Sequence, residues 1–130
     1  MTDFETLCRV RRSIRKYTEQ KVEREKLDYI LRCALMSPSG KRTNPWEFYV
    51  VTDTEKLRQM AGCRTYGSGM FETAQAAIVV ALDASLTDTW QSDGAIAATV
   101  CKFICFVHTT CQHPSSPSFG GVGEVTQCTF

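Results

Sequence analysis

Basic side chains gather in a short segment near the amino terminus, where they could bind an anion. Five of the eight residues from 9 to 16 are cationic, and a serine stands among them: Arg9, Arg11, Arg12, Ser13, Arg15 and Lys16. Guanidinium groups pair well with phosphate oxygens, and a serine hydroxyl adds another hydrogen-bond donor. Charge runs of this kind are more often solvated surface, so the segment alone favours that interpretation.

A second candidate site is the loop SPSGKRTNPW at residues 37–46. Pro38, Gly40 and Pro45 restrict its backbone, and loops of unusual path often present main-chain donors to a ligand. The alternative is an ordinary connector whose Trp46 packs in the core. Taken by itself, the loop favours the connector.

Four helices are predicted to position these two segments, at residues 3–12, 23–36, 53–61 and from Asp93 to 107. The helix at 23–36 has the clearest pattern, because its apolar residues recur at three- and four-residue spacing and Ser37-Pro38 follows it. The helix from Asp93 is apolar on almost every side. We therefore expect it to be buried nearly all round.

Strands are predicted at 47–52, which is rich in aromatic and β-branched residues, and at 76–83, a continuous apolar run typical of a covered central strand. Residues 62–73 contain three glycines and are predicted to be mobile. Residues 109–130 are rich in Gly, Pro, Ser and Thr without periodicity, so no regular structure is expected there.

The composition is that of a globular chain long enough for one compact domain, with 130 residues, 43% hydrophobic and 22% charged. A net charge of +1 gives no bulk field to attract nucleic acid or an anionic membrane. The amino terminus is acidic where a signal peptide would be basic, and no apolar run is long enough to span a membrane. We expect a cytoplasmic protein with reduced thiols.

The order of these segments is more specific than any one of them. The stretch RRSIRKYTEQKVEREKLDYILRCALMSPSGKRTNPWEFYVV resembles the opening of the nitroreductase family, which pairs an RRSxRx(F/Y) start with an amphipathic helix and a PSxxNxQPW-type loop. AAIVVALDA resembles the family's next central strand, and SDGAIAAT resembles the start of its long interface helix. The resemblance covers roughly residues 3–99.

This resemblance implies an α+β fold, with a mostly antiparallel sheet flanked by helices, in an intertwined homodimer. It also implies an oxidoreductase that binds FMN between its subunits and passes electrons from NAD(P)H to nitro or quinone compounds. The flavin would carry the chemistry while the protein supplies position and electrostatics. No catalytic side chain and no metal ligand is therefore assigned.

The resemblance also implies roles for residues of the basic segment. By motif position, Arg11, Arg12 and Ser13 would hold the phosphate and ribityl chain of FMN. Arg15 would lie near the pyrimidine edge of the ring, where a cation stabilises the negative charge of reduced flavin.

In the loop, Pro38, Ser39 and Gly40 would line the flavin ring from the partner subunit, and Asn44 stands at a position where the family has Gln. Arg42 departs from the family, which often has Asn there. That departure puts the side-chain contact in doubt, whereas the backbone path is expected to persist.

The last part of the chain differs from the rest in its cysteine and charge content. Residues 100–130 hold four of the seven cysteines but only two charged residues, Lys102 and Glu124. We therefore divide the chain into an incomplete nitroreductase-like domain, residues 1–99, and a helix continuation with an irregular Cys-rich tail, residues 100–130. Without the family's ending, we expect the chain to be poorly soluble or aggregated, with impaired FMN binding and turnover.

Two other functions stay open. One is a non-catalytic protein that keeps the first half of the family's fold with an incomplete cofactor site. The other is a small zinc-binding domain in which ligands would come from the tail: Cys101, Cys105, His108, Cys111 and His113. The cysteine spacings do not reproduce the usual zinc knuckles, which makes zinc binding the weaker of the two.

Overall fold

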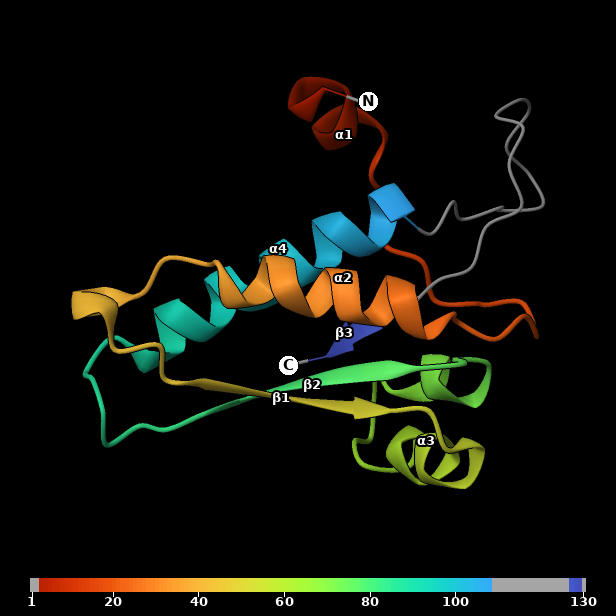
Figure 1. The fold of residues 1–130 in the computed structure, drawn as a ribbon. Coiled ribbons are helices and arrows are strands. Elements are labelled where there is room, and N and C mark those ends of the chain that lie inside the picture. The colour runs from red at the N-terminus through yellow and green to blue at the C-terminus, as the bar shows by residue number, and fades with distance from the viewer. Residues whose placement is uncertain (1–2, 109–126, 130) are drawn as a thin grey trace.

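The computed structural model describes residues 3–108 and 127–129. In chain order its elements are α1 (Phe4–Val10), α2 (Arg24–Leu35), the 3-10 helix η1 (Gly40–Arg42), β1 (Trp46–Val51), α3 (Thr54–Ala61), the 3-10 helix η2 (Gly69–Glu72), β2 (Ala77–Leu82), α4 (Trp90–His108) and β3 (Gln127–Thr129). Figure 1 shows α2 and α4 lying along one face of a small sheet, with α3 near the end of β1. This arrangement confirms the predicted α+β class.

Local signals set the starts of two helices. The carboxylate of Asp3 accepts from the N–H of Thr6 at 2.9 Å, and that of Asp53 accepts from the N–H of Lys56 at 2.9 Å. Each satisfies a main-chain donor that the first helical turn leaves unpaired. α1 and α3 therefore begin close to where the sequence predicts.

The sheet has the order β1-β2-β3. β1 and β2 run antiparallel, with Trp46 opposite Leu82 and Val51 opposite Ala77. β3 lies parallel to β2, with Ile78 opposite Cys128. The expectation that residues 109–130 lack regular structure is wrong for Gln127–Thr129, where pairing to the open side of β2 supplies backbone hydrogen bonds. The rest of that segment lies outside the described residues.

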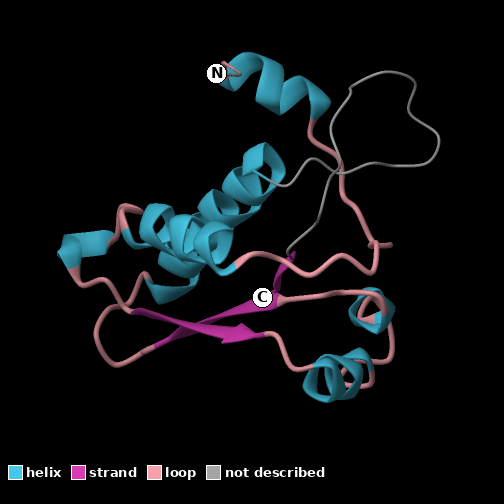
Figure 2. Ribbon diagram, turned by 45° about the vertical axis from the view of Figure 1, so that its right-hand side comes forward, coloured by secondary structure: helices cyan, strands magenta, loops and turns pink. Residues whose placement is uncertain are grey.

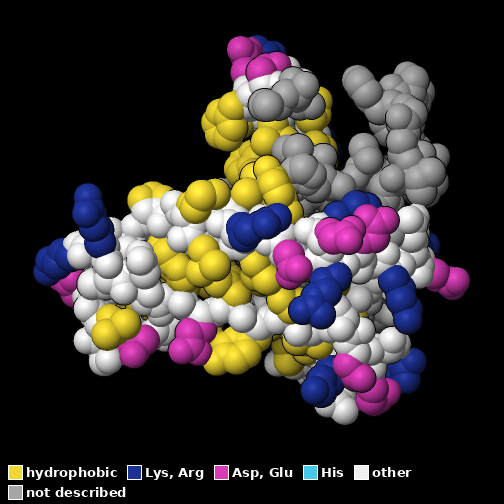
Figure 3. Space-filling model, in the orientation of Figure 1, with side chains coloured by type: hydrophobic (Ala, Val, Ile, Leu, Met, Phe, Trp, Pro, Cys, Tyr) yellow, Lys and Arg dark blue, Asp and Glu magenta, His cyan; other side chains and the backbone are white. Residues whose placement is uncertain are grey.

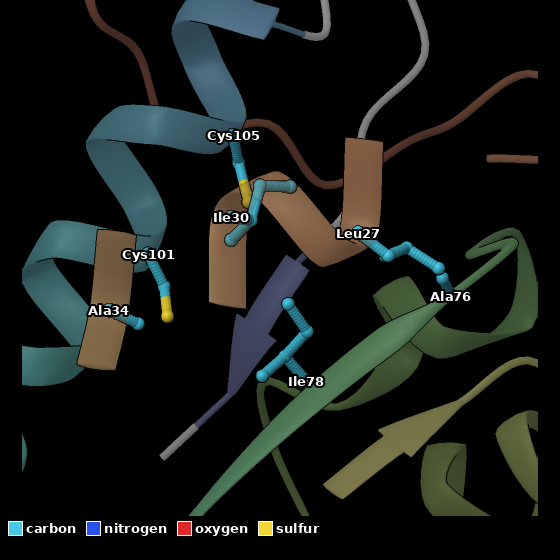
Figure 4. Close-up of a cluster of buried hydrophobic side chains, with 7 residues drawn as sticks. All are labelled: Leu27, Ile30, Ala34, Ala76, Ile78, Cys101 and Cys105. Carbon is cyan, nitrogen blue, oxygen red and sulfur yellow. The ribbon is translucent and has the colours of Figure 1, made fainter. Parts of the chain in front are cut away.

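The larger core lies between α2, α4 and the start of β2. Seven buried side chains form it, and Figure 4 shows them converging from the three elements: Leu27, Ile30, Ala34, Ala76, Ile78, Cys101 and Cys105. A second cluster of buried side chains joins Tyr17, Leu57 and Phe71 to Ala77 of β2. Through Tyr17 and Phe71, the second cluster packs the segment before α2 and the segment before β2 against the sheet.

The sequence expectation for the last helix needs correction. α4 begins at Trp90, before the predicted Asp93, and it is buried along one face while Ala95, Ile96 and Thr99 are exposed. α4 has more apolar surface than the described elements cover, so apolar side chains such as Ile96 remain exposed. The glycine-rich segment 62–73 contains η2, whose Phe71 is 2% exposed; its mobility stays a prediction.

Candidate functional site

The basic segment follows the carboxyl end of α1 and runs towards α2 without regular secondary structure. Tyr17 anchors it. The Tyr17 hydroxyl donates to the carbonyl of Ile14 at 2.9 Å, and its main-chain N–H donates to Thr73 Oγ1 at 3.2 Å. Because Tyr17 is only 9% exposed, the aromatic position of the RRSxRx(F/Y) pattern fastens the segment to the second core cluster.

The charges of this segment are largely uncompensated. Arg9 is neutralised by Glu5 one turn earlier, with Nη2 and Oε1 2.7 Å apart. Among the described residues, no carboxylate forms an ion pair with the four cations that follow it: Arg11, Arg12, Arg15 and Lys16. The segment therefore carries a local positive charge although the chain is nearly neutral.

Arg11 and Arg12 differ in what their guanidinium groups contact. Arg12 is exposed, and its Nη1 donates to the carbonyls of Arg9 at 2.8 Å and Arg11 at 2.9 Å. Arg11 is half-buried, and its Nη1 is buried with no hydrogen-bond partner among the described residues. A buried donor without a partner costs about 1–3 kcal/mol. Arg11 therefore points to an anionic or otherwise accepting group.

The other predicted residues of this segment, Ser13 and Arg15, are exposed. The four predicted residues of this segment, Arg11, Arg12, Ser13 and Arg15, therefore all lie on the irregular stretch between α1 and Tyr17. Their contacts with a cofactor stay a prediction.

The loop between α2 and β1 has an unusual backbone. Lys41, Arg42 and Asn44 have positive φ values of 52°, 57° and 45°, a left-handed region that costs non-glycine residues roughly 1–2 kcal/mol each, less for Asn. Ser39 Oγ donates to Asn44 Oδ1 at 2.8 Å, and the N–H of Asn44 donates to Ser39 Oγ at 3.0 Å. Strained residues that cluster in this way are typical of active sites and ligand-binding loops.

A buried polar atom without a partner also lies in this loop. Ser37 Oγ, directly before the predicted Pro38, has no hydrogen-bond partner among the described residues. Within that part of the chain, Ser37 Oγ and Arg11 Nη1 are the only buried side-chain polar atoms in this condition. One unpartnered atom therefore lies in or beside each candidate segment.

Two residues that hold the loop, Asp93 and Thr89, were not predicted from the sequence. The N–H of Gly40 donates to Asp93 Oδ1 at 2.9 Å, and Thr89 Oγ1 donates to Asp93 Oδ2 at 3.1 Å. The available signal was an acidic residue in the first turn of a helix of small side chains. It indicates a helix start but not a partner in a loop 53 residues earlier.

Within one chain, the structure does not bring the two groups together. Figure 1 shows the segment after α1 near one end of the α2–α4 layer and the loop with η1 beyond the other end. Figure 2, turned by 45°, shows the same separation. A single ligand could contact both groups only if they came from two copies of the chain.

Metal and membrane hypotheses receive no support from the described residues. No three His, Cys, Asp or Glu side chains of that part come together as metal ligands. Cys101 and Cys105 lie in the larger core, while Cys111 and His113 fall outside the described ranges. No helix between residues 3 and 108 is long and apolar enough to cross a membrane.

The fold, the basic segment and the strained loop together match one class of protein. The sequence profile described as the nitroreductase family matches residues 8–119. This chain belongs to the nitroreductase family. The match extends beyond residue 99, where the resemblance was expected to end, and so includes all of α4 and residues after it.

Individual relatives agree with this assignment. A protein of Archaeoglobus fulgidus provisionally named NADH dehydrogenase/NAD(P)H nitroreductase is 40% identical over 87 residues, which are 64% of this chain and 49% of the relative. The solved FMN-dependent nitroreductase of Clostridium difficile R20291 superimposes with a TM-score of 0.77 at 42% identity, covering 79% of this chain and 60% of that one. The chain thus spans about half the length of the curated relative.

The relatives do not share one reaction name. The iodotyrosine deiodinase of Danio rerio is 44% identical over 52 residues, covering 40% of this chain and 18% of the relative. Family membership therefore leaves the electron acceptor undetermined.

Proposed function

We propose that this chain binds FMN and acts as an oxidoreductase that transfers electrons from NAD(P)H to nitro or quinone compounds. The observation that carries the proposal is the pair of unpartnered buried atoms, Arg11 Nη1 and Ser37 Oγ, one in or beside each segment that resembles the family's flavin site. The relatives named as FMN-dependent or as NAD(P)H nitroreductases support the same function.

The residues present suit a phosphorylated flavin. Arg11, Arg12 and Ser13 offer guanidinium and hydroxyl donors to the phosphate and ribityl chain, and Arg15 offers a cation to the pyrimidine edge of the ring. Pro38, Ser39, Gly40 and Asn44 would face the ring from a second copy. FMN, when bound, supplies the hydride chemistry between NAD(P)H and the acceptor.

A homodimer is part of this proposal. The two candidate segments lie apart within one chain (Figure 1), so a complete site needs both copies. Large apolar side chains remain exposed: Phe4 on α1, Tyr29 and Leu35 on α2, and Met36 after it. Figure 3 shows hydrophobic side chains on α1 and over the face that carries α2. Such surface favours association.

The experiment is to purify the 130-residue chain from the cytoplasmic fraction, where we expect it, and measure its bound flavin. NAD(P)H oxidation is then followed with a nitroaromatic and with a quinone. Flavin binding with turnover of either acceptor supports the proposal. Flavin binding without turnover would favour the non-catalytic alternative, and absence of flavin binding with tight zinc binding would favour the metal-binding one.

A further inference from the structure

Asp93 is a buried carboxylate at the start of α4. Its residue is 3% exposed in the first turn of α4, and among the described residues it takes part in no ion pair. Ionised side chains are seldom buried so fully unless they are paired or extensively hydrogen-bonded. The position of Asp93 near the positive end of a helix dipole lowers that cost.

Both carboxylate oxygens of Asp93 accept hydrogen bonds. Oδ1 accepts from the N–H of Gly40 at 2.9 Å, and Oδ2 accepts from Thr89 Oγ1 at 3.1 Å. Thr89 Oγ1 in turn lies 2.9 Å from Thr87 Oγ1. The carboxylate of Asp93, held by α4, therefore accepts a charge-assisted hydrogen bond from a loop that is distant in sequence.

The loop also lies unusually close to α4. A Cβ built on Gly40 would overlap Thr89 Oγ1, so only glycine lets the loop backbone rest on the start of this helix. Lys41 and Arg42, the next two residues, have the strained left-handed backbone. Gly40 is thus the point where the strained turn is fastened to the helical layer.

We propose that Asp93 is a positioning residue that holds the Ser39–Asn44 turn in the conformation required by the flavin site. This inference rests on the proposed function. Asp93 acts through the Gly40 N–H and is not itself placed against the flavin. The other hydrogen bonds of the turn among the described residues, such as Thr43 N–H to Gly40 O at 3.1 Å, join the turn to itself. They do not set its position relative to α4.

The test compares Asp93→Ala and Asp93→Asn in the 130-residue chain. Asn keeps an oxygen that can accept from the N–H of Gly40, and its side-chain NH2 can donate to Thr89 Oγ1. Ala removes both bonds. The matched control is Asp88→Ala, which removes an exposed carboxylate just before the same helix. Two quantities are measured: amide exchange of residues 39–44 in the cofactor-free protein, and FMN affinity with the visible circular dichroism of the bound flavin.

We expect Asp93→Ala to raise exchange in the turn and weaken FMN binding about tenfold or more, as loss of a bond to a charged group predicts. The flavin dichroism should also change. Asp93→Asn should restore most of each quantity, and Asp88→Ala should match the unmodified chain. The inference is overturned if Asp93→Ala behaves like Asp88→Ala, or if Asn restores nothing.

A second pair of variants applies if Asp93→Ala fails to fold. Gly40→Ala keeps Asp93 but places a methyl group against Thr89 Oγ1, so it should displace the turn and weaken FMN binding. Adding Thr89→Ala should recover part of the loss, and no recovery would count against the inference. If the unmodified chain binds no FMN, the proposed function fails, while amide exchange still decides whether Asp93 holds the turn.

Discussion

At the scale of single residues, Arg11 and Arg12 show why neighbouring cations of one motif are not equivalent. Arg12 directs Nη1 at two main-chain carbonyls, whereas Arg11 keeps a buried Nη1 without a partner in the described part of the chain. The motif predicts basic residues at both positions. The motif does not show that Arg12 bonds main-chain carbonyls while Arg11 keeps an unpartnered donor; that difference is visible only in the structure.

Replacing both Arg11 and Arg15 with Ala is expected to weaken FMN binding at least tenfold. Each substitution removes a donor proposed to bind the phosphate or the ring edge, and hydrogen bonds to charged groups are worth about 1.5–3 kcal/mol. The matched control is Arg58→Ala with Arg64→Ala, which removes the same charge from exposed positions at and beyond α3. Flavin titration is the measurement, and equal affinity in both double variants would refute the assigned roles.

Asp3 provides a pH-dependent test of the start of α1. Hydrogen bonds from the N–H and hydroxyl of Thr6 lower the pKa of Asp3 from its ordinary value of 3.8. The cap's contribution is therefore complete above the unfolded pKa and is lost as pH falls through the lower folded pKa. The Thr6 amide resonance should titrate with a midpoint below 3.8, and Asp3→Asn should abolish this titration. A midpoint at or above the ordinary value would show that the cap is absent.

At the scale of secondary-structure elements, α2 depends on packing against α4 and β2. Ile30, whose exposed fraction is 0%, lies at the centre of the larger core. We expect Ile30→Ala to lower the free energy of unfolding by about 2–5 kcal/mol and Ile30→Val by about 0.5–1.5 kcal/mol. Urea denaturation followed by circular dichroism measures both, with Tyr29→Ala on the exposed side as control. Equal losses at positions 29 and 30 would contradict the assigned buried face.

Much of this architecture could be predicted because the signals are local. The apolar spacing of α2, the Asp53 cap of α3 and the β-branched composition of β1 are all readable in short windows. β3 could not be predicted, because three residues show no periodicity and their pairing with Ala77–Val79 is a tertiary contact. The start of α4 was misplaced because the Asp93 N–H bonds Thr89 O at 3.0 Å, which extends the helix towards Trp90.

The candidate site was predictable in its residue types and not in its geometry. The family-like motifs indicate Arg11 to Arg15 and Pro38 to Asn44, but they contain nothing that reveals the bond from Gly40 to Asp93. Nor do they show that the two segments lie apart within one chain (Figure 2). Both features depend on how α2 and α4 pack.

At the scale of the whole molecule, the proposed flavin site needs two copies of the chain. Exposed apolar side chains at Leu35 and Met36, 57% and 75% exposed, adjoin the loop that would meet a partner's flavin. β3 covers one side of β2 over three residues only. We therefore still expect association, with larger particles beside the dimer.

Sedimentation velocity with detection at a flavin wavelength is the most direct test of a flavin site shared between two copies, because it reports bound FMN and particle size together. We expect saturable flavin absorbance that sediments with protein in species larger than the 14.6 kDa monomer. Arg11→Ala with Arg15→Ala should reduce that absorbance, and Arg58→Ala with Arg64→Ala should not. Flavin that sediments only as free FMN, or that is bound fully by the monomer, would contradict a flavin site built from two copies of this chain.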